Sequence, residues 1–267
     1  MQKSNNITTQ SNRLSVQVTL TGLSFLVTSH NRDEVLFFKE HTFPAQYTPQ
    51  DILVVLKSEI DKETILKDCS EISVVYADSA YTLVPKVLFD ETKLSEYLKF
   101  NSKLLAGDFI AFDDVENHDM NVVYVPLVNV NNYFFETFGS FQYYHATSIL
   151  LATILTAEKQ QDKSTMYIHV GQHQIDLIAV ENGALLLCNS YPFKTSEDLA
   201  YYVLFAFEQL KWSTNTVETL LLGEISEKSP HFELLYTYIR NLSIYSVESK
   251  LTTDLLEPHQ HYLLKNT

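Results

Sequence analysis

The sequence predicts an α/β protein made of two copies of one β-β-β-α-β-α unit, each a mixed five-stranded sheet with flanking helices. Two observations predict this fold class. The same succession of apolar strands, a capped helix and a further strand occurs twice, which indicates an internal repeat. The first strands start at residues 14 and 166, 152 apart, and the fourth strands at 72 and 219, 147 apart. Three antiparallel strands followed by a helix and a parallel strand form a mixed sheet.

The first copy contains four short strands and one helix. Alternating apolar residues predict the strands 14–20, 23–28, 35–38 and 72–76. A turn at Thr21-Gly22 separates the first two. Thr48 and Pro49 have the residue types of an N-cap and a first helical position, so they predict a helix that begins there.

The second copy repeats this arrangement with clearer turn signals. Its predicted strands are 166–170, 175–180, 184–189, 219–222 and a short 244–247. Asn182-Gly183 is typical of a type I′ hairpin. Thr195 and Asp198 form a capping box ahead of a helix over 196–210, and a second helix is expected near 230–240.

The remaining segments complete the predicted domain organisation. Residues 1–12 are expected to be a disordered lead-in, 13–157 a first domain with an inserted segment at about 81–142, and 158–267 a second domain with a C-terminal tail. The run 143–156 predicts a helix that returns the chain to the second copy. His259 and His261 lie in the tail, which we interpret as a docking tail.

Composition excludes several classes of protein. Six glycines in 267 residues form no cluster, whereas phosphate-binding loops need several close together. The net charge of −14 disfavours nucleic acid and anionic membranes. No apolar stretch is long enough to span a membrane, and Cys69 and Cys188 lie in apolar surroundings, so we expect a cytoplasmic protein with free thiols and no membrane insertion.

Three segments carry a resemblance to known proteins: LVPKVLFDETKLSEYLKFN, the Y-H-x-x-S-I-L-L run from Tyr144, and LLLCNSYPFKTSEDLAYYVLFAFEQL. They resemble a family of uncharacterised bacterial proteins, a domain of unknown function described as having an actin-like ATPase fold. The repeated unit is similar to the plan of the actin-like, ribonuclease-H-like superfamily. The resemblance covers about 14–250. It implies a nucleotide-type cleft between the two units but brings no established activity.

In that superfamily three motifs serve the nucleotide, and all three are altered here. The turn Thr19-Leu20-Thr21-Gly22 keeps the glycine but has Thr19 where an Mg²⁺-organising aspartate is expected. The second motif has His169 in the aspartate position, followed by Gly171, Gln172 and His173 in the turn. The third motif has one glycine, Gly223, followed by Glu224.

These changes predict a non-catalytic binding or assembly module that needs no cofactor. The alternative is an active ATPase or kinase that binds ATP with Mg²⁺ through non-standard carboxylates, and its candidate acids are Glu224, Asp176 and Asp78. At least two carboxylates in an open cleft would favour the enzyme. A cleft filled by Gln172 and His173 would favour the module.

Two clusters of histidine and carboxylate residues have side chains of the types that bind metal ions. His169 and His173, with His145 or Asp176, are interpreted as a polar turn, and the acidic run 113–119 is interpreted as a solvated loop because it lacks a calcium-loop glycine. No metal ligands are therefore assigned.

An aromatic cluster is the candidate surface for an unidentified protein partner. Aromatic side chains are enriched at interface cores, and a dense group of them lies between the predicted insert and the helix 143–156. The candidate patch contains Tyr133, Phe134, Phe135, Phe138, Phe141, Tyr143 and Tyr144. The sequence leaves the ligand, the partner and the oligomeric state open.

Overall fold

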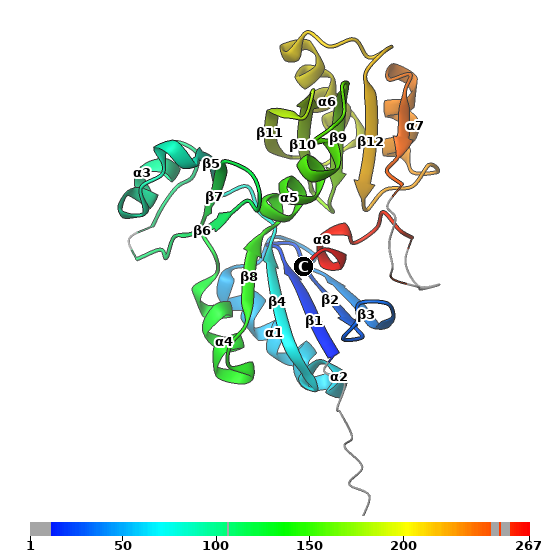
Figure 1. Cartoon of the computed structure of the whole chain (residues 1–267). Coiled ribbons are helices and arrows are strands. Elements are labelled where there is room, and N and C mark those ends of the chain that lie inside the picture. Colours follow the sequence, from blue (N-terminus) through cyan, green and yellow to red (C-terminus); the bar gives the residue numbers. More distant parts are fainter. Residues whose placement is uncertain (1–11, 106, 247–250, 252–256) are drawn as a thin grey trace, which may run out of the picture.

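The computed structural model describes residues 12–105, 107–246, 251 and 257–267. Two five-stranded sheets, each with its own helices, and a smaller three-stranded sheet make up the described part (Figure 1). The predicted lead-in lies outside the described residues, except for Asn12, which begins the first strand.

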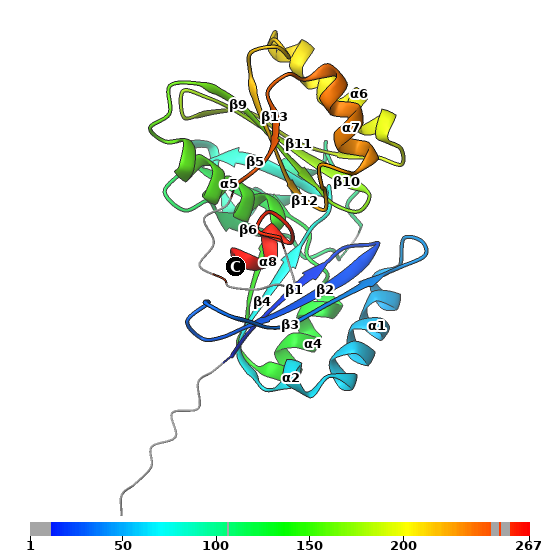
Figure 2. The ribbon, with the colours of Figure 1, turned by 90° about the vertical axis from the view of Figure 1, so that its right-hand side faces the viewer.

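The first sheet has the strand order β3-β2-β1-β4-β8. Its strands are β1 (Asn12–Val18), β2 (Gly22–Thr28), β3 (Val35–Thr42), β4 (Cys69–Tyr76) and β8 (Gln142–His145). The first two pairings are antiparallel, and β4 and β8 join in parallel. One face is covered by α1 (Pro49–Lys62), α2 (Thr64–Lys67) and α4 (Val128–Phe138) (Figure 2). As predicted, Thr48 caps α1 and Pro49 is in its first turn.

The second sheet repeats this order and these directions as β11-β10-β9-β12-β13. Its strands are β9 (Ser164–Val170), β10 (Gln174–Glu181), β11 (Ala184–Pro192), β12 (Glu218–Gly223) and β13 (Leu242–Ile244). Two helices, α6 (Ser196–Leu210) and α7 (Pro230–Tyr238), pack on its outer face, and the capping box of Thr195 and Asp198 is formed. The short strand predicted at 244–247 is β13, which begins earlier, at Leu242, and ends at Ile244. Val247 lies outside the described residues.

The helix α5 (Ala146–Glu158) lies between the two sheets. Nine of its thirteen residues are buried, which is typical of a helix covered on all sides. Ile149, Leu150 and Ile154 belong to one apolar core with Tyr167 and Ile178 of the second sheet. The main core therefore runs from the first sheet through α5 to the inner face of the second.

The inserted segment ends earlier than predicted. Its own sheet, ordered β5-β7-β6, contains β5 (Tyr81–Pro85), β6 (Ala111–Asp114) and β7 (Met120–Tyr124), with η1 (Lys86–Leu88), η2 (Glu91–Lys93) and α3 (Leu94–Leu98) beside it. The following α4 packs on the first sheet and β8 belongs to it, so the predicted limit of 142 includes one helix too many. The helix predicted from Tyr143 starts at Ala146, because the His145 ring accepts a hydrogen bond from Thr147 N and caps the helix there.

The C-terminal tail packs against the first sheet rather than staying with the second. Its short helix α8 (Tyr262–Lys265) buries Tyr262 and Leu263 in the main core. The Thr267 hydroxyl lies 2.6 Å from that of Ser15 on β1. His259 holds the tail to the second sheet, because its Nε2 lies 2.7 Å from the Ile225 carbonyl oxygen. The docking tail thus docks on its own chain.

The predicted aromatic patch is not an open surface. Phe134 is fully buried and anchors contacts to Phe138 and Phe141 at ring-centroid distances of 5.8 and 5.7 Å. Five others, Tyr133, Phe138, Phe141, Tyr143 and Tyr144, pack against the main core. Of the whole patch, Phe135 alone is largely exposed, at 66%. These residues were expected to bind a partner, but they fill the space between α4 and the edge of the first sheet.

Two further findings concern thiols and membranes. Cys69 and Cys188 are both free, and burial raises the pKa of their thiols to about 11 and about 12. Among the helices of the described residues, none has the length and apolar character required to cross a bilayer.

Candidate functional site: the cleft between the sheets

A cavity of about 140 Å³ lies where the turns of the two sheets meet. Eight of the nine predicted cleft residues line it, and the exception is Gly223. The lining includes Thr19, Thr21, Gly22, His169, Gly171, Gln172, His173 and Glu224, with Glu40, Asp78, Gln174 and Asp176. Distant segments of the sequence are therefore brought together as the resemblance implied.

The hydroxyl of Thr19 stabilises the first turn. Thr19 Oγ1 accepts a hydrogen bond from Thr21 N at 3.1 Å and donates one to the Gly22 carbonyl at 3.0 Å. A Ser or Thr side chain that bonds to its own turn in this way closes the turn without any ligand. The position that holds the metal-organising carboxylate in the superfamily is thus committed to backbone structure.

In the second turn, His169 forms a buried pair with Asp176. His169 Nδ1 lies 2.9 Å from Asp176 Oδ2, and both side chains are less than a tenth exposed. Asp176 Oδ1 also accepts hydrogen bonds from Gln174 and Ser190. Burial opposes the charged form of Asp176, but the bonds from His169, Ser190 and Gln174 outweigh it and hold its pKa below the usual value. The Asp176 carboxylate is therefore engaged in three hydrogen bonds with the chain itself.

Gln172 connects the two halves across the cleft. Its Nε2 donates a 2.7 Å hydrogen bond to Thr42 Oγ1 at the end of β3. Its Oε1 also lies 3.6 Å from the position that a β-carbon on Gly22 would occupy. His173 is exposed at the same turn, and its carbonyl accepts a hydrogen bond from Phe193 N. The cleft is consequently narrowed by side chains of its own turns.

The cavity is acidic. Glu40, Asp78, Asp176 and Glu224 line it, and none of its described lining residues is a Lys or Arg. Burial, followed by the nearby Glu40, raises the pKa of Glu224 to about 7. Burial also raises the pKa of Glu40. Because phosphate groups are bound through cations and backbone N–H groups, this lining offers little to a triphosphate.

Two of the glycines near the cleft are required by neighbouring backbone. Gly223 has φ +91°, and a β-carbon there would lie 2.3 Å from the Val170 carbonyl oxygen. A β-carbon on Gly22 would lie 2.9 Å from the His41 carbonyl oxygen. Close approach of strands therefore explains these glycines without a phosphate.

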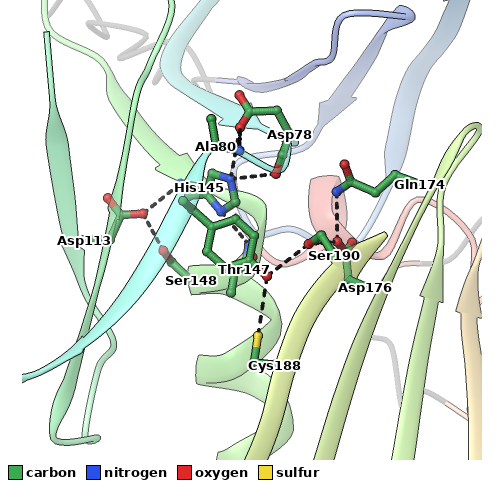
Figure 3. A network of polar contacts seen from close by, with 11 residues as sticks. Asp78, Ala80, Asp113, His145, Thr147, Ser148, Gln174, Asp176, Cys188 and Ser190 are labelled. Carbon is green, nitrogen blue, oxygen red and sulfur yellow. Dashed lines mark hydrogen bonds and ion pairs between the residues drawn. The ribbon is translucent and has the colours of Figure 1, made fainter. Parts of the chain in front are cut away.

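A polar network beside the cleft contains residues that the sequence interpretation missed (Figure 3). The Tyr81 hydroxyl lies 3.0 Å from Ser190 Oγ and so joins the insert to β11. His145 Nε2 lies 3.2 Å from the Asp78 carbonyl oxygen. Asp78 and His145 are sequence candidates in other roles, whereas no sequence signal marks Tyr81 and Ser190, because each stands alone in its own segment.

Asp113 corrects the solvated-loop interpretation of the run 113–119. It belongs to β6, and its carboxylate accepts hydrogen bonds from the Tyr124 hydroxyl, His145 N and Ser148 Oγ. Burial raises its pKa although these bonds lower it. The neighbouring Asp114, Glu116 and Asp119 are exposed, so only the first acid of the run is structural.

Of the residues considered as metal ligands, only His169 and Asp176 are brought into contact. His169 bonds to Asp176, whereas His145 faces Asp78 on the other side of the network. Within the described residues no three His, Cys, Asp or Glu side chains are grouped so that they could hold a metal ion.

Solved structures define the class of protein to which this arrangement belongs. The chain is similar to a protein of actin-like ATPase fold and unknown function from Bacteroides thetaiotaomicron VPI-5482, with 20% identity, a TM-score of 0.77, and coverage of 91% of this chain and 94% of that one. It is also similar to the PilM-PilN type IV pilus biogenesis complex, with 12% identity, a TM-score of 0.61, and coverage of 92% and 91%. The chain therefore has the actin-like fold.

The sequence itself places the chain in a family. The profile of the family described as "Protein of unknown function (DUF3822)" matches residues 1–242, so the chain belongs to that family. A search of the curated proteins found no match. The expected resemblance to an uncharacterised family with an actin-like fold is thus confirmed.

Proposed function

We propose that this protein is a non-catalytic binding or assembly module of the cytoplasm, which keeps the actin-like fold and engages a protein partner. The observation that carries the proposal is the buried pair of His169 and Asp176, which occupies the position of the second nucleotide motif and is also bonded to Gln174 and Ser190. A carboxylate held in this way is not free to organise a hydrated cation.

The size and charge of the cleft support the same conclusion. A cavity of about 140 Å³ is smaller than the roughly 300 Å³ at which pockets begin to enclose drug-sized ligands. Opening it for a nucleotide requires loss of the bond between Gln172 and Thr42. A related argument comes from the fold comparison, since one of the similar structures is a complex, PilM-PilN.

Thermal unfolding with and without Mg·ATP tests the proposal. We expect no shift of the Tm up to millimolar ligand. A nucleotide at 100 times its Kd adds about 2.7 kcal/mol to the free energy of unfolding, which amounts to several degrees for a chain of this size. A saturating shift at micromolar Mg·ATP overturns the expectation that the cleft takes no nucleotide, and steady release of phosphate overturns the non-catalytic function; ADP and magnesium alone serve as controls.

A specific observation favours a second candidate function, an ATPase or kinase that uses non-standard carboxylates. Four carboxylates line the cavity, and at least two are what this function needs. One of them, Glu224, has a pKa of about 7, and a general base works best when its pKa is near the working pH. This alternative predicts phosphate release from ATP by the purified chain and its loss in Glu224→Gln. Equal release by both proteins counts against it.

A further inference from the structure

A second hollow lies between the insert and the second sheet. It is a groove of about 450 Å³ bounded by residues 81–83 of β5 on one side and 188–190 of β11 on the other. Both strands are edges of their sheets, so each has one row of backbone groups without a strand partner in the described chain. The direction of those rows decides whether they face the groove.

On β5, a neighbouring hydrogen bond identifies which backbone groups point away from β7. Lys86 N donates to the Asp119 carbonyl at 3.0 Å, in the register that pairs Leu83 with Val122. Hydrogen-bonded pairs alternate along an antiparallel ladder, so the N–H and C=O of Thr82 point toward β7 and those of Leu83 point away from it. The same parity places Pro85, which has no N–H, at an outward position, as expected on an edge strand.

On β11, the same reasoning gives the outward row. Phe193 N donates to the His173 carbonyl at 3.0 Å, in the register that pairs β11 with β10. The N–H and C=O of Cys188 and Ser190 therefore point away from β10, and Pro192 again occupies an outward position. Cys188 and Ser190 line the groove, as do Tyr81 and Leu83 of the outward row of β5.

The groove is held at its width by a side chain. The hydroxyl of Tyr81 reaches Ser190 Oγ at 3.0 Å and lies 3.8 Å from Cys188 Sγ. Because this contact is made through a long side chain, it connects the two edges without letting them pair directly. The groove is thus preformed, which lowers the entropy lost on binding.

We propose that this groove binds an extended, non-acidic segment of a partner protein as an additional strand between β5 and β11. The inference rests on the proposed protein-binding function and names its site. Main-chain hydrogen bonds to sheet edges give affinity in this mode of recognition. The lining side chains are uncharged hydroxyl, amide, thiol and aliphatic groups, and the chain carries a net charge of −14, so an acidic segment is disfavoured.

The first test uses a displayed library of random linear 12-residue peptides, selected on the full chain. The best peptide is then resynthesised with one backbone N-methyl group at a time. We expect binding to weaken by about tenfold or more at consecutive residues along the bound stretch, because the N–H groups of a strand between two edges face β5 and β11 in turn. Uniform tolerance of N-methylation, or failure to select any binder, overturns the inference.

The second test compares two variants of the same outward position. Cys188→Pro removes an N–H that the sheet does not use, whereas Cys188→Ala removes the same thiol and keeps the N–H. We expect the proline variant to bind the selected peptide about tenfold more weakly than the alanine variant. Circular dichroism checks that both are folded, and the N-methyl series decides the question if the proline variant is not. Equal affinity, together with uniform tolerance of N-methylation, leaves a protein-binding function intact but contradicts a strand in this groove.

Discussion

The cleft between the two five-stranded sheets and the groove between β5 and β11 use their polar groups in opposite ways. In the cleft, Thr19, Gln172 and Asp176 bond to other residues of the chain. Along the groove, the outward backbone groups of Leu83 and Cys188 have no strand partner in the described part. Satisfied polar groups stabilise a fold, and unsatisfied ones are available to a partner. We therefore propose that the groove, rather than the cleft, is where this protein engages a partner.

The largest change in the free energy of unfolding is expected when the buried carboxylate of Asp176 is removed. Asp176→Asn should lower the free energy of unfolding by about 4 kcal/mol, because it leaves His169 and Ser190 without their charged partner. Urea unfolding measures it. Asp114→Asn is the control, since its pair with Lys86 is solvent-exposed and the change should stay below about 0.5 kcal/mol. A loss below 1 kcal/mol for Asp176→Asn would mean that the cleft is not held by this residue.

The next largest effect is expected from replacing two glycines near the cleft, Gly223 and Gly171, whose surroundings differ. Gly223→Ala should cost about 3 kcal/mol, because its φ of +91° and the Val170 carbonyl oxygen both oppose a β-carbon. Gly171→Ala should cost less than about 1 kcal/mol, since the nearest atom is 3.3 Å away. Thermal unfolding of both variants checks this difference. Equal costs would contradict the assignment of Gly223 to strand packing.

The stability of the cleft should also depend on pH through Glu224. Its folded pKa of about 7 lies above the ordinary 4.5, so the folded chain binds more protons between these values and stability falls as the pH rises through that window. Glu224→Gln removes this loss and should be more stable than the parent by about 2 kcal/mol at pH 8, with little difference at pH 4. Urea unfolding at both pH values measures this, with the exposed Glu227→Gln as control. A constant difference across pH would contradict a protonated Glu224.

The smallest effect concerns the bond that joins the two halves. Gln172→Ala and Thr42→Ala each remove one partner of a single 2.7 Å hydrogen bond. A double-mutant cycle on the free energy of unfolding should give a coupling of about 0.5–1 kcal/mol. Strictly additive losses would show that the two turns are not linked by this bond.

Much of the fold could be predicted from the sequence because its signals are local. Alternation located β1 to β4 and β9 to β12, and the capping residues Thr48 and Thr195 located the starts of α1 and α6. The strand β8 was missed because its four residues run without a turn into the apolar helix α5, and only the ring of His145 marks the change. Pairing with β4 is a tertiary contact that no local pattern records.

The candidate site could be predicted in position but not in its bonding. Motif matching brought Thr19, His169 and Glu224 to one cavity. The sequence could not single out Asp176, rather than His145 or His173, as the partner of His169, because spacing along a chain does not say which side chains share a sheet face. Asp113 was misinterpreted for the same reason, since its acidic neighbours are exposed and it is not. The edge strands that border the groove became visible only in the strand order.

Hydrogen exchange measured on one sample of the full chain tests the contrast between cleft and groove most directly. With the selected peptide, we expect slower exchange in residues 81–85 and 184–192 and no change in 17–24 and 169–174. With millimolar Mg·ATP we expect no protection in either region. Protection of 17–24 and 169–174 by Mg·ATP, with none along β5 and β11 on adding the peptide, would contradict the account.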